Sequence, residues 1–312
     1  MTGSPLNLMH HLRAGKQVLM DGAMGTELER RGVPFEGSGW SAYAVRDHDS
    51  VIRQVHRDYV DCGARLHIVN SFALARHVLE PLGIGNLFDS LNRKSVAVCE
   101  AAIEESGHRR EDHWVAGSLS TFCANSDRSL LPRGDALVKN YRDQAQILQQ
   151  AGVDLFAFEM LFDVETSLAM IQATEGLGLP VILGFTCDWG LDENSRTVTT
   201  RPMGRPAIPL DTVLPEVIAA SRSMDTILSI MHSQFDVTNA ALAVLKRYWE
   251  GPIAIYPNSG TFVDLHMQFD SVCPAGEFKS VAVNWKRQGA QIIGGCCGLG
   301  PKHINALADQ FD

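Results

Sequence analysis

Short apolar runs alternate with longer amphipathic stretches along the 312 residues, and this pair recurs eight times. In residues 51–62, for example, Val51, Val55, Tyr59 and Cys62 recur at the spacing of one helix face. Apolar runs that are bounded by turn residues and separated by such helices are typical of buried parallel strands. The predicted strands span residues 17–23, 65–72, 114–119, 154–160, 180–187, 226–232, 252–258 and 291–297.

Eight consecutive strand–helix units predict an α/β fold of the (β/α)8 TIM-barrel type. A doubly wound open sheet is the alternative, but eight regular units that fill the chain favour a closed barrel. The sequence shows no linker or low-complexity tract, so we expect a single domain over residues 1–312. The longest irregular stretch, residues 188–209, has a length that usually serves to bind a ligand or cover a site.

Composition and charge narrow the class of protein. A hydrophobic content of 45% with 20% charged residues is ordinary for a globular domain, and the net charge of −9 argues against a nucleic-acid partner. We expect no membrane span, because no apolar run approaches about 18 residues. Residues 1–15 lack the apolar segment of a signal peptide, and the seven cysteines follow no framework spacing. A reducing, cytoplasmic location is therefore expected, and both a monomer and a homo-oligomer stay open.

The strongest local motif is the run Gly294-Gly295-Cys296-Cys297-Gly298 at the end of the last predicted strand. Adjacent Cα atoms lie about 3.8 Å apart, below the usual lower limit of about 4.4 Å for a disulfide. Two thiolates that bind one soft metal ion are the better interpretation, because flanking glycines allow both sulfurs to turn the same way. The alternative is a pair of small buried residues at a strand end.

Polar or metal-binding side chains stand at the end of nearly every predicted strand, where barrel enzymes carry their active site. These residues are Asp21, Asn70, Ser118, Glu159, Thr186, Cys187, His232, Asn258, Cys296 and Cys297. Asn70, Ser118 and Asn258 also suit a turn, as does Asp21 before Gly22. Glu159 follows the apolar run Phe156-Ala157-Phe158, where an ionised carboxylate needs a cationic partner, and a bound ammonium group would supply one.

His232, Cys296 and Cys297 would place an imidazole and two thiolates in one centre. A Cys2His set with one exchangeable position is a known catalytic zinc site. Sulfur ligands disfavour magnesium and calcium, and copper or iron suits this set less well than zinc. The alternative for His232 is an ordinary histidine at a strand end.

Several segments together resemble the zinc-dependent homocysteine S-methyltransferase family. They are residues 19–28, 40–41, 56–59, 115–118, 158–159, 256–260 and 294–298. The resemblance implies a (β/α)8 barrel in which Zn²⁺ binds the thiolate of homocysteine, and a methyl donor converts it to methionine. Family donors are sulfonium compounds, betaine or methylcobalamin. The chain length is similar to that of the short members, which use S-methylmethionine or S-adenosylmethionine.

The resemblance also implies roles for single residues. Glu159 and Asp21 would hold the amino-acid part of homocysteine, near backbone amides around Ala23 and Met24. The family's third zinc ligand is a cysteine at the end of a Gly-x-Asn-Cys segment. Here histidine occupies that position, in Ser229-Ile230-Met231-His232. We expect His232 to replace the cysteine as a ligand, and Cys187 on the neighbouring strand is a less suitable substitute.

Two other functions stay open. A non-catalytic or repurposed relative would bind an amino acid or a sulfonium compound without transferring a methyl group, which the change at His232 would permit. A metal-dependent hydrolase would use the ion to activate water. The early His-x-His pair of many barrel hydrolases is absent from the sequence, and paired cysteines favour a thiolate ligand. The main prediction is a methyltransferase whose partners are homocysteine and a small methyl donor.

Overall fold

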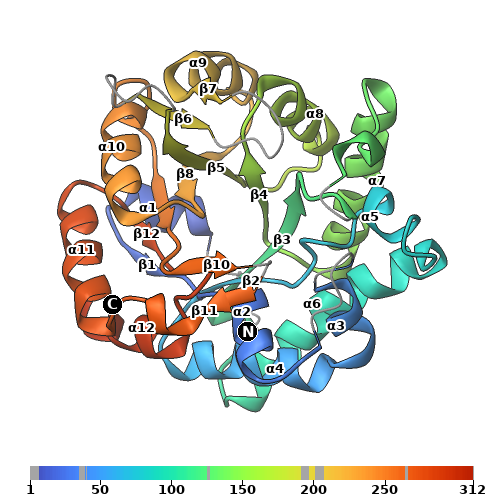
Figure 1. Cartoon of the computed structure of the whole chain (residues 1–312), viewed down its shortest axis with the longest axis horizontal. Helices are drawn as coiled ribbons and strands as arrows, with labels where there is room; N and C mark the ends of the chain where they lie inside the picture. Colours follow the sequence, from blue (N-terminus) through green and yellow to red (C-terminus); the bar gives the residue numbers. More distant parts are fainter. Residues whose placement is uncertain are drawn as a thin grey trace.

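Eight parallel strands surround a common axis in the order β1-β12-β9-β8-β5-β4-β3-β2 (Figure 1). The structure is a computed structural model that describes residues 7–34, 39, 41–124, 127–190, 197–200, 207–263 and 266–311. Trp40, which contributes to the family resemblance, lies outside the described residues. The strands are β1 (Val18–Leu19), β2 (Leu66–Ile68), β3 (Trp114–Ser120), β4 (Leu155–Leu161), β5 (Val181–Trp189), β8 (Thr226–Met231), β9 (Ile253–Tyr256) and β12 (Ile292–Ile293).

The ring of strands closes at β1. On one side Val18 and Leu19 pair with Ile292 and Ile293 of β12. On the other side a parallel bridge joins Met20 to Leu66 of β2, and the Asp21 amide donates to the Leu66 carbonyl at 2.9 Å. The sheet therefore forms a (β/α)8 barrel, as predicted, and the open-sheet alternative does not apply.

A helix follows each strand and covers the outside of the barrel (Figure 1). Apolar residues at helical spacing account for this placement: α4 buries Ile52, Val55 and Tyr59 on one face. Local signals set the ends, since Gly152 stops α7 in a left-handed conformation and the Asp163 side chain caps α8. These helices are α4 (Asp49–Asp61), α6 (Phe88–Glu105), α7 (Asp135–Ala151), α8 (Val164–Thr174), α9 (Leu210–Ala220), α10 (Phe235–Leu245), α11 (Ala275–Arg287) and α12 (Pro301–Asn305).

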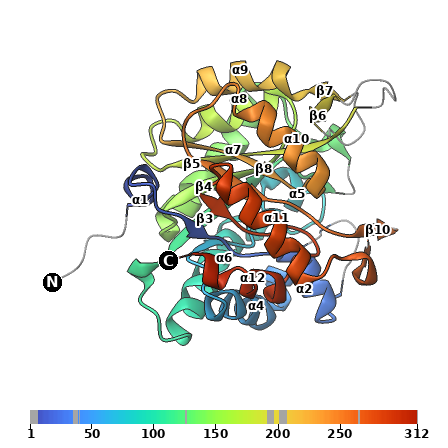
Figure 2. The same cartoon turned by 90° about the vertical axis from the view of Figure 1, so that its left-hand side faces the viewer.

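Short helix α1 (Leu8–Arg13) closes the N-terminal end of the barrel. Its Leu8, Met9 and Leu12 join the same buried cluster as Trp114 and the first residues of other strands. Each fully buried apolar side chain contributes about 1.5–3 kcal/mol of hydrophobic stabilisation. Figure 2 shows α1 at one end of the barrel and the β10 hairpin at the opposite end. Because α1 covers the N-terminal end of the barrel, the C-terminal ends of the strands are the end at which a ligand can bind.

Several short elements were not predicted. Part of the stretch 188–209 is sheet rather than loop, because β5 runs on to Trp189 and pairs with β6 (Val198–Thr200), which pairs with β7 (Ile208–Pro209). Residues 191–196 and 201–206 of that stretch lie outside the described residues. The other new elements are the hairpin of β10 (Thr261–Val263) and β11 (His266–Gln268), and helices α2 (Gly25–Arg30), α3 (Ala42–Asp47) and α5 (Arg76–Leu79). Among the residues that the structure describes, no helix has the length and apolar character to cross a bilayer.

Candidate metal centre and substrate site

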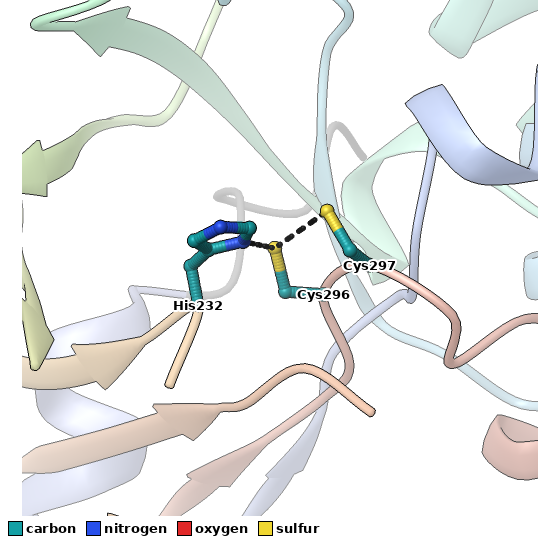
Figure 3. Close-up of side chains that lie close together, drawn as sticks. All are labelled: His232, Cys296 and Cys297. Atoms are coloured by element: carbon teal, nitrogen blue, oxygen red, sulfur yellow. Dashed lines mark hydrogen bonds between the residues drawn. The ribbon is translucent and has the colours of Figure 1, made fainter. Parts of the chain in front are cut away.

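His232, Cys296 and Cys297 meet at the C-terminal ends of β8 and β12 (Figure 3). The Cys296 sulfur lies 3.5 Å from His232 Nδ1 and 3.9 Å from the Cys297 sulfur. The three potential ligand atoms all lie within 4.8 Å of one another, and each side chain is half-buried. The predicted Cys2His group is thus assembled, and Cys187 does not join it.

Backbone contacts fix the two cysteines. The Cys296 amide donates to the Pro257 carbonyl at 2.7 Å, and the Cys297 carbonyl accepts from the Ser259 amide at 3.0 Å. Gly298 has a φ of 83° and lies against the Ser259 carbonyl, so a side chain there would be both strained and blocked. A Cβ at Gly294 would lie 2.5 Å from the Asp21 carbonyl oxygen. The glycines therefore let the loop after β12 pack between the loops after β1 and β9.

His232 has a strained backbone, with a φ of 45°. Among the described residues, only His232 and Met160 combine a positive φ with a side chain, and Met160 directly follows Glu159. The His232 amide donates to the Tyr256 carbonyl at 3.1 Å, and its carbonyl accepts from Thr186 Oγ1 at 3.0 Å. Such strain costs on the order of 1–3 kcal/mol and gathers at functional sites. Hydrogen bonds to the neighbouring strands thus hold the His232 backbone in this strained conformation, with its imidazole toward Cys296.

The protonation of the thiols favours a cation at this position. The neighbouring Cys297 sulfur, and then burial, raise the pKa of the Cys296 thiol well above its usual value, while His232 acts in the opposite direction. Adjacent thiols ionise together only when positive charge lies beside both, which a divalent soft metal ion provides. The donor set and its spacing therefore fit a metal ion.

Glu159 lies on β4 and is buried, with 7% of its surface exposed. Its Oε2 accepts a short hydrogen bond from the Ser118 hydroxyl on β3. Burial raises the pKa of Glu159 to about 7, although the Ser118 hydrogen bond and the nearby His232 lower it. A cationic ligand beside a buried carboxyl group of raised pKa stabilises its ionised form. Ser118, one of the strand-end residues that also suited a turn, is thus the partner of Glu159.

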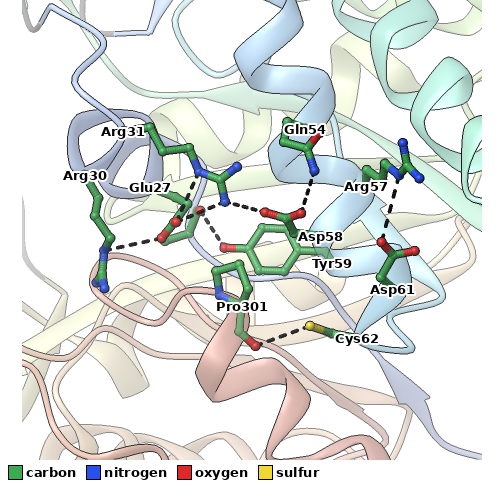
Figure 4. A network of polar contacts seen from close by, with 11 residues as sticks. Glu27, Arg30, Arg31, Gln54, Arg57, Asp58, Tyr59, Asp61, Cys62 and Pro301 are labelled. Atoms are coloured by element: carbon green, nitrogen blue, oxygen red, sulfur yellow. Dashed lines mark hydrogen bonds and ion pairs between the residues drawn. The ribbon is translucent and has the colours of Figure 1, made fainter.

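Asp21 is buried after β1, and its Oδ2 accepts from the Ile68 amide at 2.9 Å. Burial raises the pKa of Asp21 well above its usual value, and the negative charge of Glu159 adds to this. The following loop is held in place, because the Ala23 amide donates to the Leu299 carbonyl at 3.1 Å and the Tyr59 hydroxyl to the Ala23 carbonyl at 2.7 Å. Figure 4 shows Tyr59 among the ion pairs beside this loop. Met24 is the N-cap residue of α2.

Residues 18–311 match the model of a family described as Homocysteine S-methyltransferase. The chain belongs to the homocysteine S-methyltransferase family. It is 28% identical to homocysteine S-methyltransferase 4 of Zea mays, with 98% of this chain and 94% of that protein aligned. It is 29% identical to the homocysteine S-methyltransferase of Escherichia coli K12, over 93% and 94% of the two chains. The predicted activity, methyl transfer to the thiol of homocysteine, is thereby confirmed.

The barrel of this homocysteine S-methyltransferase is also similar to a solved structure. The crystal structure of the homocysteine methyltransferase MmuM from Escherichia coli in its metallated form superposes with a TM-score of 0.77 at 26% identity, and covers 98% of this chain and 100% of that one. The fold prediction is thus confirmed independently of the strand pairing.

Two further strand-end residues of this methyltransferase carry buried polar atoms without hydrogen-bond partners, Asn70 Nδ2 and Asn258 Oδ1. An unpaired buried polar atom costs about 1–3 kcal/mol, so both favour a polar ligand or an ordered water molecule at this end of the barrel. The sequence placed them at strand ends but gave no signal that distinguished a ligand contact from a turn.

Proposed function

We propose that this homocysteine S-methyltransferase binds Zn²⁺ through Cys296, Cys297 and His232, and that it methylates homocysteine with a sulfonium donor. The observation that carries this proposal is the convergence of two thiols and one imidazole within 4.8 Å at the ligand end of the barrel. All seven cysteines are free, which supports a reducing location such as the cytoplasm and a role in methionine biosynthesis.

When bound, zinc supplies the positive charge that keeps the sulfur of homocysteine in the thiolate form, which is the nucleophile. The protein then has to position the rest of the substrate. Glu159 accepts hydrogen bonds from the ammonium group, and Ser118 fixes the orientation of its carboxylate. Asp21 places a second carboxyl group on the same side, and the loop at Ala23 and Met24 lies next to the substrate carboxylate.

The charge of the site favours a cationic methyl donor. Glu159, Asp21 and two cysteines lie at one end of the barrel, and the chain has a net charge of −9. A sulfonium group such as that of S-methylmethionine or S-adenosylmethionine brings positive charge to this region. Methyl transfer needs the donor sulfur, the methyl carbon and the acceptor sulfur in line, so the rate depends on how both substrates are positioned.

The test combines zinc analysis with an assay of homocysteine against a panel of methyl donors. The protein, purified under reducing conditions, should carry zinc at this centre. Cys296→Ala should lose that ion and the activity while it stays folded, because the site is at the open end of the barrel. Cys273→Ala is the matched control, since Cys273 is another half-buried free thiol that lies outside the metal group.

The same experiment tests the alternative of a non-catalytic relative. Retention of the full zinc content in Cys296→Ala would show that the ligand assignment is wrong. Absence of zinc from the unmodified protein, or bound zinc without methyl transfer to any donor, would favour a relative that binds an amino acid or sulfonium compound only.

A further inference from the structure

A second group of potential metal ligands lies between the barrel and helix α4. It consists of Asp21 after β1, His56 on α4 and His67 on β2, and one ligand atom of each lies within 4.8 Å of the others. Leu66 and Ile68 on either side of His67 pack against the cluster inside the barrel, so His67 faces the helices. His56 and His67 are fully buried and Asp21 is 3% exposed. This group shares no residue with the Cys2His centre.

Three ring nitrogens of this group are unsatisfied. Neither ring nitrogen of His56 has a hydrogen-bond partner, nor does Nδ1 of His67. Asp21 receives the Ile68 amide, but no ion pair to Asp21 exists among the described residues. An unpaired buried polar atom is unfavourable because it has lost its hydrogen bonds to water. Two imidazoles and a carboxylate can each donate a lone pair, so a cation at their centre would satisfy all three groups.

A neighbouring histidine orients His67 for this purpose. His67 Nε2 lies 3.0 Å from His113 Nδ1, just before β3. Burial lowers the pKa of His67 well below its usual value and that of His56 to about 4, so both rings are neutral and each keeps one lone pair. When the hydrogen of His67 is on Nε2, toward His113, Nδ1 keeps its lone pair and has no hydrogen-bond partner. Metal-binding histidines commonly have such a partner on the second ring nitrogen.

We propose that Asp21, His56 and His67 bind a second divalent transition-metal ion. Two imidazoles and one carboxylate suit Zn²⁺, Co²⁺, Ni²⁺ or Fe²⁺ rather than Mg²⁺ or Ca²⁺. Three atoms no more than 4.8 Å apart have a common point at most about 2.8 Å from each. Metal bonds to nitrogen and oxygen measure about 2.0–2.2 Å, so side-chain shifts of well under 1 Å complete the site. The ion would keep Asp21 ionised beside the substrate pocket.

The test counts ions on the full chain. After metal removal and saturation with Zn²⁺, the unmodified protein should bind two ions, and Cys296→Ala and His56→Gln should each bind one. His67→Gln repeats the test with a second ligand. His113→Leu, which removes only the partner of His67, should weaken the second ion by about 10–100-fold. His303→Gln is the control, because His303 is also buried with an unpaired Nδ1 but belongs to neither group, and it should still bind two ions.

Cobalt distinguishes the two centres. With Co²⁺ the Cys2His centre gives thiolate charge-transfer bands, whereas the second site gives only visible ligand-field bands. The ligand-field bands of the second site should disappear in His56→Gln. Saturation of the unmodified protein at one ion, with cobalt bands identical in His56→Gln, would overturn the proposal and leave an ordered water molecule between the three side chains. If Cys296, Cys297 and His232 do not bind metal, the charge-transfer bands will be absent instead. The experiment therefore distinguishes a wrong Cys2His assignment from a wrong second site.

Discussion

Several residues at the site are unfavourable in isolation. Glu159 and Asp21 are buried carboxyl groups with raised pKa values, and His232 has a left-handed backbone. A cation would offset the cost of burying each carboxylate, and the proposed metal ion would give the strained His232 a role. The need for positive charge therefore explains both why these residues are unfavourable without a ligand and why the site selects a cationic one.

Glu159 should make the binding of the amino acid depend on pH near neutrality. Below its pKa of about 7 the carboxyl group is protonated and no longer attracts an ammonium group. The dissociation constant of methionine, which has no thiol proton to lose, should rise about tenfold between pH 8 and pH 6. Glu159→Gln should abolish this dependence and raise the KM of homocysteine by about 10–100-fold, as expected for the loss of one charge-assisted contact.

Titration calorimetry with methionine measures the pH dependence, and steady-state kinetics measure the KM. A KM that stays unchanged in Glu159→Gln, at the zinc content of the unmodified protein, would remove Glu159 from the substrate-binding role.

His232→Cys tests the third ligand. A cysteine would make the centre more negative by one unit, so the homocysteine thiol should ionise less readily and the pH profile of its binding should shift upward. Zinc affinity and the pH profile of both proteins provide the measurement. Zinc that binds poorly to the unmodified protein and well to His232→Cys would show that His232 lies outside the metal shell. Equal affinities and identical profiles would mean that position 232 does not touch the metal.

Residue type at strand ends predicted much of the candidate site, and partners across strands were not predictable. His232 and Glu159 are conspicuous because they directly follow apolar runs, and Cys296 and Cys297 because they form an adjacent pair between glycines. The pairing of Ser118 with Glu159 depends on the register of β3 against β4, which sequence spacing does not reveal. His56 and His67 belong to a helix and a strand, and only their packing brings them together.

At the scale of elements, the site depends on close packing between loops. The loop after β12 touches the loop after β1 at Gly294 and Gly295, and it touches the loop after β9 at Gly298. Each contact joins backbone to backbone, and a methyl group at Gly294 or Gly298 would collide with the carbonyl oxygen of the neighbouring loop. The positions of Cys296 and Cys297 are therefore set by residues that have no chemistry of their own.

Gly294→Ala should destabilise the protein and weaken metal binding. Its Cβ would lie 2.5 Å from the Asp21 carbonyl oxygen and 2.9 Å from Met20, a degree of overpacking that costs about 1–3 kcal/mol. Gly276→Ala on α11 is the matched control, because a Cβ there meets nothing within 4 Å. It should leave stability unchanged or raise it by up to about 1 kcal/mol. Chemical denaturation and zinc titration of both variants check this, and equal behaviour would contradict the packing argument.

Long helices and buried strands were predictable because each repeats one period over several turns or residues. Helix α4, for example, spans Asp49–Asp61 where the sequence predicts a helix over 51–62. Elements such as β6 and α2 hold too few residues to show a period, and β6 owes its structure to pairing with β5. The missed elements all lie in connections, where tertiary contacts rather than local pattern decide the conformation.

At the scale of the whole molecule, a metal ion at the proposed Cys2His centre would join two distant parts of the chain. His232 follows β8 and Cys296 follows β12, and the two residues are 64 positions apart. An ion that binds only the folded barrel stabilises it by mass action, by about 2.7 kcal/mol at a free concentration of 100 times the dissociation constant.

Zinc should therefore raise the melting temperature, and a chelator should lower it. Differential scanning fluorimetry of His56→Gln, which lacks the second proposed site, and of the double variant His56→Gln/Cys296→Ala measures the effect, which should be much smaller in the double variant. An equal shift in both proteins would mean that zinc acts elsewhere.

The closure of the barrel has a consequence for biosynthesis. Strand β12, at Ile292–Ile293, completes the ring by pairing with β1, at Val18–Leu19, and the two cysteines come directly after it. A ribosome has therefore made all eight strands of the barrel before the Cys2His centre can form. Earlier nascent chains expose the edges of β1 and β9 and have no ion at this centre to hold them together. Insertion of the proposed metal ion would thus be a late event that reports synthesis of all eight strands and correct closure of the ring.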